Sequence, residues 1–287
     1  MDVDIWKKLK QKKRIFEYDL ICTNFFMICN PLFFMLSGKF NLNKEFNSLE
    51  DYKKYYKSKI ITIFIPFFIV SIIIYFLNNY NNLSLIDFFE KFTSGSIEGT
   101  YWFIYNLIGI IIITPFLSKM IKNMNLLDKK IYFYFVIVIT SFITVILALG
   151  KKTIINFATF GIISWIFYYL LGYFVEDVFK SSKSRKIIIC IGLLAFVLQL
   201  IIERFFKSAY RIYDPSPILT LEAVSLYFLI LNYIKIKNEG IKKIILLIAK
   251  YSYIFYLFHN TIIDYTFKFI KFNLNMSSKM NMVYGVI

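Results

Sequence analysis

Residues 31–66 read Pro31-Leu-Phe-Phe-Met-Leu-Ser-Gly38, a lysine-rich connector as far as Lys59, and then Ile60-Ile-Thr-Ile-Phe-Ile-Pro66. The second apolar segment continues to Leu77 without a charged residue. A hydrocarbon core about 30 Å thick needs about 20 apolar residues at about 1.5 Å per residue. This stretch therefore predicts a membrane-spanning hairpin, and the lysines of its connector indicate the cytoplasmic side.

The composition extends this interpretation to the whole chain. Of the 287 residues 58% are hydrophobic and 20% are aromatic, which excludes an ordinary soluble domain. The net charge of +16 lies in short blocks between apolar runs. That distribution predicts a lipid bilayer with anionic headgroups as the partner, and no nucleic acid. With one histidine and no Cys-x-x-Cys pair, we expect no metal site.

The apolar runs predict an all-α fold, a polytopic transmembrane helical bundle of about eight spans. After a first segment at 19–38, the expected spans are 59–78, 101–119, 131–149, 154–175, 187–203, 216–235 and 251–269. No soluble domain interrupts them, so we expect one domain over residues 1–287. It begins with a basic segment at 1–18 and ends with a truncated last span at 280–287.

The loops between these spans differ in charge. The expected inner loops are 39–59, 119–130, 176–186 and 235–250, and the outer loops are 79–100, 150–153, 203–215 and 268–279. The inner loops hold nineteen Lys and Arg and the outer loops nine. This bias predicts a multi-pass protein of the cell (cytoplasmic) membrane. Within inner loop 235–250, the apolar run 241–250 is too short to span and predicts an interfacial amphipathic helix.

The first apolar segment, Leu20 to Leu36, follows a basic N-terminus. It is long and lacks an A-x-A-like cleavage site, so a retained anchor is favoured over a signal peptide. If residues 19–38 cross once, the basic N-terminus and the lysine-rich connector fall on opposite sides of the membrane, against the charge rule. Either the segment dips in and returns, bent at Asn30-Pro31, or one crossing is missing here.

Four stretches carry a resemblance to a known family. They are Pro31-Leu-Phe-Phe-Met-Leu-Ser-Gly38, Tyr101-Trp-Phe-Ile-Tyr-Asn-Leu-Ile-Gly-Ile-Ile-Ile-Ile-Thr-Pro-Phe-Leu117, Tyr169-Leu-Leu-Gly-Tyr-Phe174 and Ser252-Tyr-Ile-Phe-Tyr-Leu-Phe-His259. In this order the chain, from about residue 14 to its end, resembles the acyltransferase 3 family of integral membrane acyltransferases. The resemblance implies about ten spans and transfer of an acyl group, usually acetyl, from cytoplasmic acetyl-CoA or another acyl-CoA. The implied acceptor is a hydroxyl of a cell-surface or lipid-linked glycan, and the acyl-CoA is a donor substrate and not a bound cofactor.

The chain departs from the family pattern at several positions. The family's first helix carries an Arg and, eleven residues later, a His that acts as base, but Cys22 stands at the Arg position and no histidine precedes His259. The chain resembles one in which the start of the family's first helix is joined directly to the end of its second, between Thr23 and Pro31. A second signature, two arginines three apart and a proline four residues on, is matched here by Lys59, Thr62 and Pro66. The alternative is that Lys59 is a topology lysine and Pro66 a tolerated kink.

Ionisable residues inside a span are candidates for function, because their burial in lipid is unfavourable. His259, about 12 Å from the inner start of its span, is the candidate catalytic base, and a neutral hydrogen-bonded histidine is the alternative. Glu222 and Asp264 are expected at similar depths and could form an acidic pair. The remaining candidates for binding the donor or acceptor are Lys53, Lys54, Lys57 and Lys59 on the cytoplasmic side, with Trp102, Tyr105 and Asn106.

Two functions follow from these observations. The first is an O-acyltransferase whose turnover is weak or absent, because the expected first-helix Arg and His are missing. The second is a non-catalytic membrane protein, either a decayed family copy or a carrier or flippase that moves intact glycan.

Overall fold

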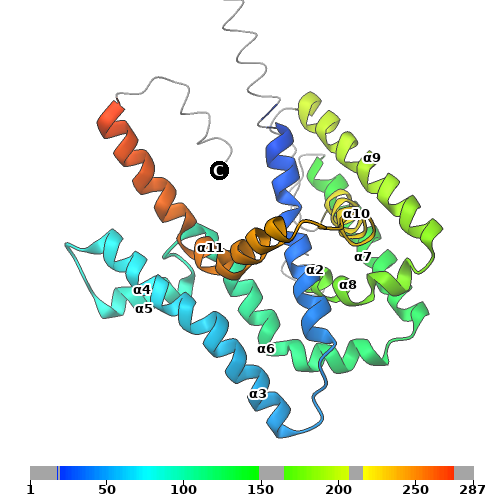
Figure 1. Ribbon diagram of the computed structural model, residues 1–287, viewed down its shortest axis with the longest axis horizontal. Coiled ribbons are helices and arrows are strands. Elements are labelled where there is room, and N and C mark those ends of the chain that lie inside the picture. Colours follow the sequence, from blue (N-terminus) through cyan, green and yellow to red (C-terminus); the bar gives the residue numbers. More distant parts are fainter. Residues whose placement is uncertain (1–17, 19, 149–164, 207–215, 275–287) are drawn as a thin grey trace, which may run out of the picture. The chain divides into compact units, whose positions relative to one another are not determined.

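The computed structural model describes residue 18 and residues 20–148, 165–206 and 216–274. These residues form helices and short connections with no strand among them, which confirms the all-α prediction (Figure 1). Outside the described residues lie all but residue 18 of the predicted basic segment 1–18, the predicted loop 150–153, the start of the predicted span 154–175, most of the predicted loop 203–215, the end of the predicted loop 268–279 and the predicted last span 280–287. The helices, in chain order, are α2 (Cys29–Leu42), α3 (Leu49–Lys59), the π-helix η1 (Ile60–Phe64), α4 (Ile65–Asn79), α5 (Leu85–Ser94), the 3₁₀-helix η2 (Gly99–Tyr101), α6 (Trp102–Asn123), α7 (Leu126–Ala148), α8 (Trp165–Val178), α9 (Ser182–Phe206), α10 (Pro217–Tyr233) and α11 (Glu239–Leu274).

Four of the described helical stretches are long and apolar enough to cross a membrane. They are Leu20–Leu42, Leu49–Asn79, Gly99–Asn123 and Ser182–Ile202, and Pro217–Tyr233 is a shorter apolar helix. Each overlaps a segment that the sequence predicts to be inserted. The predicted total of about eight spans stays a prediction.

The first inserted segment does not reverse its direction. Helical residues from Leu20 to Leu42 are interrupted by a turn at Ile28, and both parts run the same way in Figure 1. Pro31 is buried at the third position of α2, where a helix has no partner for the backbone N–H that proline lacks. Pro31 therefore starts α2 without bending the chain back, so the predicted return at Asn30-Pro31 does not occur.

The contacts divide the chain into two compact units. Unit 1 comprises Met1–Lys44, Leu117–Ile234 and Ser278–Ile287, and unit 2 comprises Glu45–Phe116 and Lys235–Ser277. Of the described helices, α2, α7, α8, α9 and α10 lie in unit 1, whereas α3, α4, α5 and α11 lie in unit 2 with the first part of α6.

Unit 1 is organised by two close helix pairs, α2 with α8 and α9 with α10. Its fully buried side chains are mostly aromatic: Phe34, Phe167, Tyr168, Tyr169, Phe174, Tyr227 and Phe228. At the crossing of α2 and α8, glycines allow the two backbones to touch. A Cβ atom on Gly38 would lie 1.7 Å from the Tyr169 carbonyl oxygen, and one on Gly172 would lie 1.8 Å from that of Met35. Small residues at helix crossings are the usual route to such close packing in membranes.

Unit 2 begins with one continuous helical path, α3, η1 and α4. Its start is fixed by a capping box, in which the Ser48 side chain accepts from the Asp51 N–H and the Asp51 carboxylate accepts from the Ser48 N–H. The path widens to a π-helix at Ile60–Phe64, just before Pro66. Proline cannot donate the usual backbone hydrogen bond, and a π turn is one of the ways a helix accommodates this loss.

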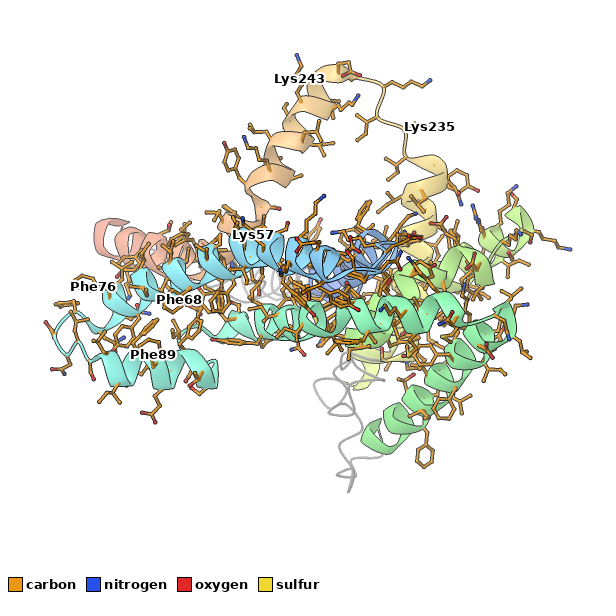
Figure 2. The ribbon with its side chains drawn as sticks, turned by 90° about the horizontal axis from the view of Figure 1, so that it is seen from below. Lys57, Phe68, Phe76, Phe89, Lys235 and Lys243 are labelled. Carbon is orange, nitrogen blue, oxygen red and sulfur yellow. The ribbon has the colours of Figure 1, made fainter. Side chains whose placement is uncertain are left out.

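The predicted outer loop 79–100 contains a helix that folds back along α4. Tyr75 donates a hydrogen bond of 2.7 Å to Asp87, while Phe68 contacts Phe88 and Phe92 with ring centroids 5.9 Å and 5.4 Å apart. Helix α5 is thus antiparallel to α4, as Figure 2 shows beside the labelled Phe76 and Phe89. This arrangement differs from a simple surface loop, because the apolar side chains of α5 need a neighbour to cover them.

Helix α11 joins two segments that the sequence predicts separately. The expected interfacial helix 241–250 and the expected span 251–269 form one helix, Glu239–Leu274. Figures 1 and 2 show that α11 bends, so that its first part, which carries Lys243, runs in a different direction from its last part.

Candidate functional site

A set of hydrogen bonds joins α11 to the segment that precedes α6 within unit 2. The Tyr256 hydroxyl donates to the Thr100 carbonyl at 2.5 Å, and the Tyr101 hydroxyl donates to the Leu257 carbonyl at 3.0 Å. The Asn260 amide nitrogen lies 3.1 Å from a carboxylate oxygen of Glu98. These reciprocal bonds fix one turn of α11 against η2, so side chains on that turn are held in defined positions.

His259 lies on this turn and is half-buried. Its Nδ1 atom is 2.5 Å from the backbone carbonyl oxygen of Tyr256, and its ring lies 5.3 Å from the Tyr256 ring. Because a carbonyl only accepts, Nδ1 carries the proton and donates, which leaves Nε2 of the neutral imidazole as an acceptor. The hydrogen bond thus selects the tautomer that a general base requires at Nε2.

The depth of this turn follows from the neighbours of α6. The Tyr56 hydroxyl donates to the Ile112 carbonyl at 2.7 Å, and the Phe67 ring lies 5.1 Å from the Tyr101 ring. Helix α6 is therefore antiparallel to α3 and α4, and its start lies level with Phe67, about 12 Å along the helix from Lys59. The Glu98 to Tyr101 segment therefore lies level with the middle of the predicted span 59–78, and its depth in a bilayer stays a prediction.

Lys59 and Pro66 flank the π-helix η1, which contains Thr62, and this segment contacts the helix that carries His259. The Tyr253 hydroxyl donates to the Ile63 carbonyl at 2.8 Å. Thr62 bonds within its own helix, its hydroxyl donating to the Ser58 carbonyl at 2.8 Å. The structure therefore brings two of the predicted segments together through Tyr253, and π turns are frequent at functional sites.

The predicted donor-binding lysines lie on α3. Lys53, Lys54 and Lys57 are exposed, and Lys53 pairs with Glu50 at 3.1 Å (Lys57 is labelled in Figure 2). The Lys59 ammonium lies 5.7 Å from the centroid of the Tyr55 ring. The three exposed lysines are available to an anionic ligand in solution.

The other predicted binding residues on α6 have separate surroundings. The Tyr105 hydroxyl donates to the Phe92 carbonyl of α5, and its ring packs 5.3 Å from Phe67. Asn106 bonds to the Trp102 carbonyl one turn earlier at 2.8 Å, and both residues are exposed. Tyr105 thus anchors α5, whereas the side chains of Trp102 and Asn106 face outward.

Glu222 and Asp264 fall in different units. Glu222 is 3% exposed on α10, in unit 1, two residues after Thr220, whose hydroxyl contacts that of Tyr168 at 3.1 Å. Asp264 is exposed on α11, in unit 2. Their pairing stays a prediction.

Two polar groups were not anticipated from the sequence. The sequence predicts Glu98 in the outer loop 79–100 and does not reveal its contact with Asn260 of α11. The Gly95 turn, which has a positive φ of 75°, and the apolar pattern of residues 85–92 indicate only the helix that precedes it. In unit 1, Lys39 pairs with Glu176, and Tyr227 donates to Glu176 at 2.6 Å. The sequence predicts Lys39 only as one of the topology lysines, because its partner Glu176 lies far away along the chain.

No group of three or more His, Cys, Asp or Glu residues in the described part of the chain could hold a metal ion.

Comparison with known proteins gave one match. A family described as an acyltransferase domain, Acyl_transf_3, matches residues 6–287. No curated protein and no solved structure matches the chain.

Proposed function

The chain belongs to the acyltransferase 3 family, whose members are membrane acyltransferases, and we propose that it transfers an acyl group from a cytoplasmic acyl-CoA to a hydroxyl of a glycan. Acetyl is the proposed acyl group, and a cell-surface or lipid-linked glycan is the proposed acceptor. The observation that carries the proposal is the orientation of His259, whose Nδ1 contacts the Tyr256 carbonyl at 2.5 Å.

In the proposed reaction, Nε2 of His259 accepts the proton of the acceptor hydroxyl while the hydroxyl oxygen attacks the thioester carbonyl carbon. The C–S bond then breaks, CoA leaves as its thiol after taking a proton, and the acyl group remains on the acceptor oxygen. A positioned general base of this kind contributes typically 10²–10⁴-fold in rate. The hydrogen bonds of Tyr256 and Asn260 keep the His259 turn in place during this step.

The exposed lysines of α3 fit the donor end of this reaction. Lys53, Lys54 and Lys57 lie before the span predicted at 59–78, on the side that the charge bias predicts to be cytoplasmic. Ammonium groups attract the phosphates of CoA as point charges. The proposed donor site therefore has its cationic part on α3 and its reacting part near α11, both within unit 2.

The second candidate is a non-catalytic protein that binds or moves intact glycan. It is favoured by Cys22, which occupies the position where the family resemblance implies an arginine, and by the absence of any histidine before His259.

The test is transfer of radiolabelled acetyl from acetyl-CoA to envelope glycan by the reconstituted chain. We expect His259→Gln, which keeps a polar side chain but removes the base, to lower transfer by about 10²–10⁴-fold. Ser252→Ala is the matched control, because Ser252 is exposed on the same helix and its hydroxyl donates to the Ala249 carbonyl of its own helix.

Transfer that survives in His259→Gln would exclude His259 as the base. Absence of transfer in the unchanged chain and in both variants would favour the non-catalytic candidate.

A further inference from the structure

The segment that precedes the site on α11 is a cationic and apolar arm with no packing partner among the described residues of unit 2. We call residues 235–250 the basic arm. It contains five lysines and one glutamate, and every residue in it is exposed. Figure 2 shows Lys235 and Lys243 on this arm, away from the other helices of unit 2.

The arm is amphipathic along its helical part. At about 100° per residue, Lys242, Lys243 and Lys250 share one side of the helix. The opposite side carries Ile241, Ile244, Ile245 and Ile248, of which Ile244 is 59% and Ile248 64% exposed. A soluble protein does not leave such a continuous apolar face in water without a reason.

The helix of the arm starts from a local signal. The Asn238 side chain accepts hydrogen bonds from the Gly240 N–H at 2.8 Å and the Ile241 N–H at 3.1 Å. A cap fixes where a helix begins, but a helix of this length without packing is marginal in water. The arm therefore needs a surface that covers its apolar side.

We propose that the basic arm docks on a bilayer surface of anionic lipid headgroups. The arm is continuous with the segment predicted to span at 251–269, so its end at Lys250 lies at the bilayer surface. The bend of α11 lets the arm run in a different direction from that segment (Figures 1 and 2). The excess of four lysines over glutamate complements anionic headgroups.

The apolar side of the arm distinguishes a bilayer from a soluble anion. An acyl-CoA phosphate would neutralise lysines such as Lys242 and Lys243 but would leave Ile244 and Ile248 in water. A lipid surface satisfies both sides of the helix at once, because headgroups and acyl chains meet at the interface. The proposal does not rest on catalysis, and its test does not measure transfer.

The experiment uses the full chain in lipid nanodiscs, with Cys22, Cys29 and Cys190 replaced by serine. A polarity-sensitive fluorophore is attached to Ile245→Cys, and its exposure to a water-soluble quencher is measured. One bilayer is phosphatidylcholine alone, and the other contains phosphatidylcholine and phosphatidylglycerol in roughly equal parts. We expect protection from the quencher in the anionic bilayer and its loss at high salt.

The charge variant is Lys242→Gln, Lys243→Gln and Lys250→Gln together. Each lysine near an anionic surface strengthens binding by a factor of about five, so the triple variant weakens docking by about a hundredfold. The matched control removes the same charge elsewhere, by Lys180→Gln, Lys183→Gln and Lys186→Gln, and keeps full protection.

Full quenching in both bilayers, without protection in either, would overturn the proposal. Protection that is equal in both and insensitive to the lysine changes would assign the apolar side to a protein surface. Protection that appears only on addition of acyl-CoA would assign the lysines to the donor.

Discussion

Replacing Gly38 by alanine tests whether the backbone contact between α2 and α8 holds unit 1 together. The new Cβ atom would lie 1.7 Å from the Tyr169 carbonyl oxygen, whereas Cβ atoms essentially never approach such a neighbour within 3.0 Å. The helices must therefore separate by about 1.3 Å. A gap of about 0.5–1 Å already removes a quarter to a half of the dispersion energy of a contact. Phe34 and Met35 are fully buried, so they lose more than half of the dispersion energy of their contacts across the interface.

We expect Gly38→Ala to lower the free energy of unfolding by about 3 kcal/mol, the upper end for overpacking, because backbone atoms cannot move aside as a side chain can. Gly172→Ala meets the Met35 carbonyl at 1.8 Å and should have a similar effect. The double variant should cost little more than either alone, because one separation relieves both clashes.

The assay is unfolding by SDS in mixed detergent micelles, followed by the fluorescence of Trp165, which stacks on Phe34 at 5.0 Å. Trp6 and Trp102 are replaced by phenylalanine to leave one reporter. The control is Gly109→Ala, a helical position where a Cβ meets nothing within 4 Å, and it should stabilise by about 0.5–1 kcal/mol. Equal stability of Gly38→Ala and Gly109→Ala would refute the argument.

Three further outcomes are expected. Tyr253→Phe removes the hydrogen bond to the Ile63 carbonyl and should lower the free energy of unfolding by about 1 kcal/mol in the same assay. An unchanged free energy of unfolding would contradict this hydrogen bond. Hydrogen bonds from the Ser48 N–H and hydroxyl hold the pKa of Asp51, which precedes the span at 59–78, below its usual value. At a pH above the usual pKa of an aspartate, the start of α3 should therefore be protected from amide hydrogen exchange. This protection should be lost as the pH falls through the lowered pKa of Asp51. The Asp51→Asn variant should not show this pH dependence. In a cysteine-free background, a cysteine at Asn47 should resist a membrane-impermeant thiol reagent in intact cells while one at Asn81 reacts, and the reverse pattern would contradict the predicted orientation.

The helices themselves could be predicted from the sequence, because long apolar runs bounded by charge allow little else. The run from Ile60 to Leu77 and the run from Trp102 to Leu117 both lie within helices of the structure. Charge blocks do not predict loop positions as well, because most lysines of the predicted loops 39–59 and 235–250 lie on helices α3 and α11.

The arrangement of side chains in the site could not be predicted in the same way. Nothing in the residues around Glu98 reveals that α5 folds back and carries this carboxylate to the level of Phe67, because that depends on aromatic packing between Phe68 and Phe92. The pairing of Lys39 with Glu176 joins residues 137 positions apart, and a lysine near a helix end looks the same whether it is paired or not. The apolar periodicity of a sequence describes one helix at a time, whereas the position of Glu98 and the Lys39–Glu176 pair both depend on how neighbouring helices pack.

The π-helix at Ile60–Phe64 makes the length of this segment as important as its composition. The Ile65 N–H bonds to the Ile60 carbonyl, five residues back, so the turn holds one residue more than an α-helix would. If the same number of residues were wound as a regular α-helix, α3 would be rotated by about 100° relative to α4. Tyr55 and Tyr56 would then leave the Ile111 and Ile112 carbonyls, and the lysines of α3 would face another way. A relative without the π turn would therefore need one residue fewer in this segment to present the same cationic surface.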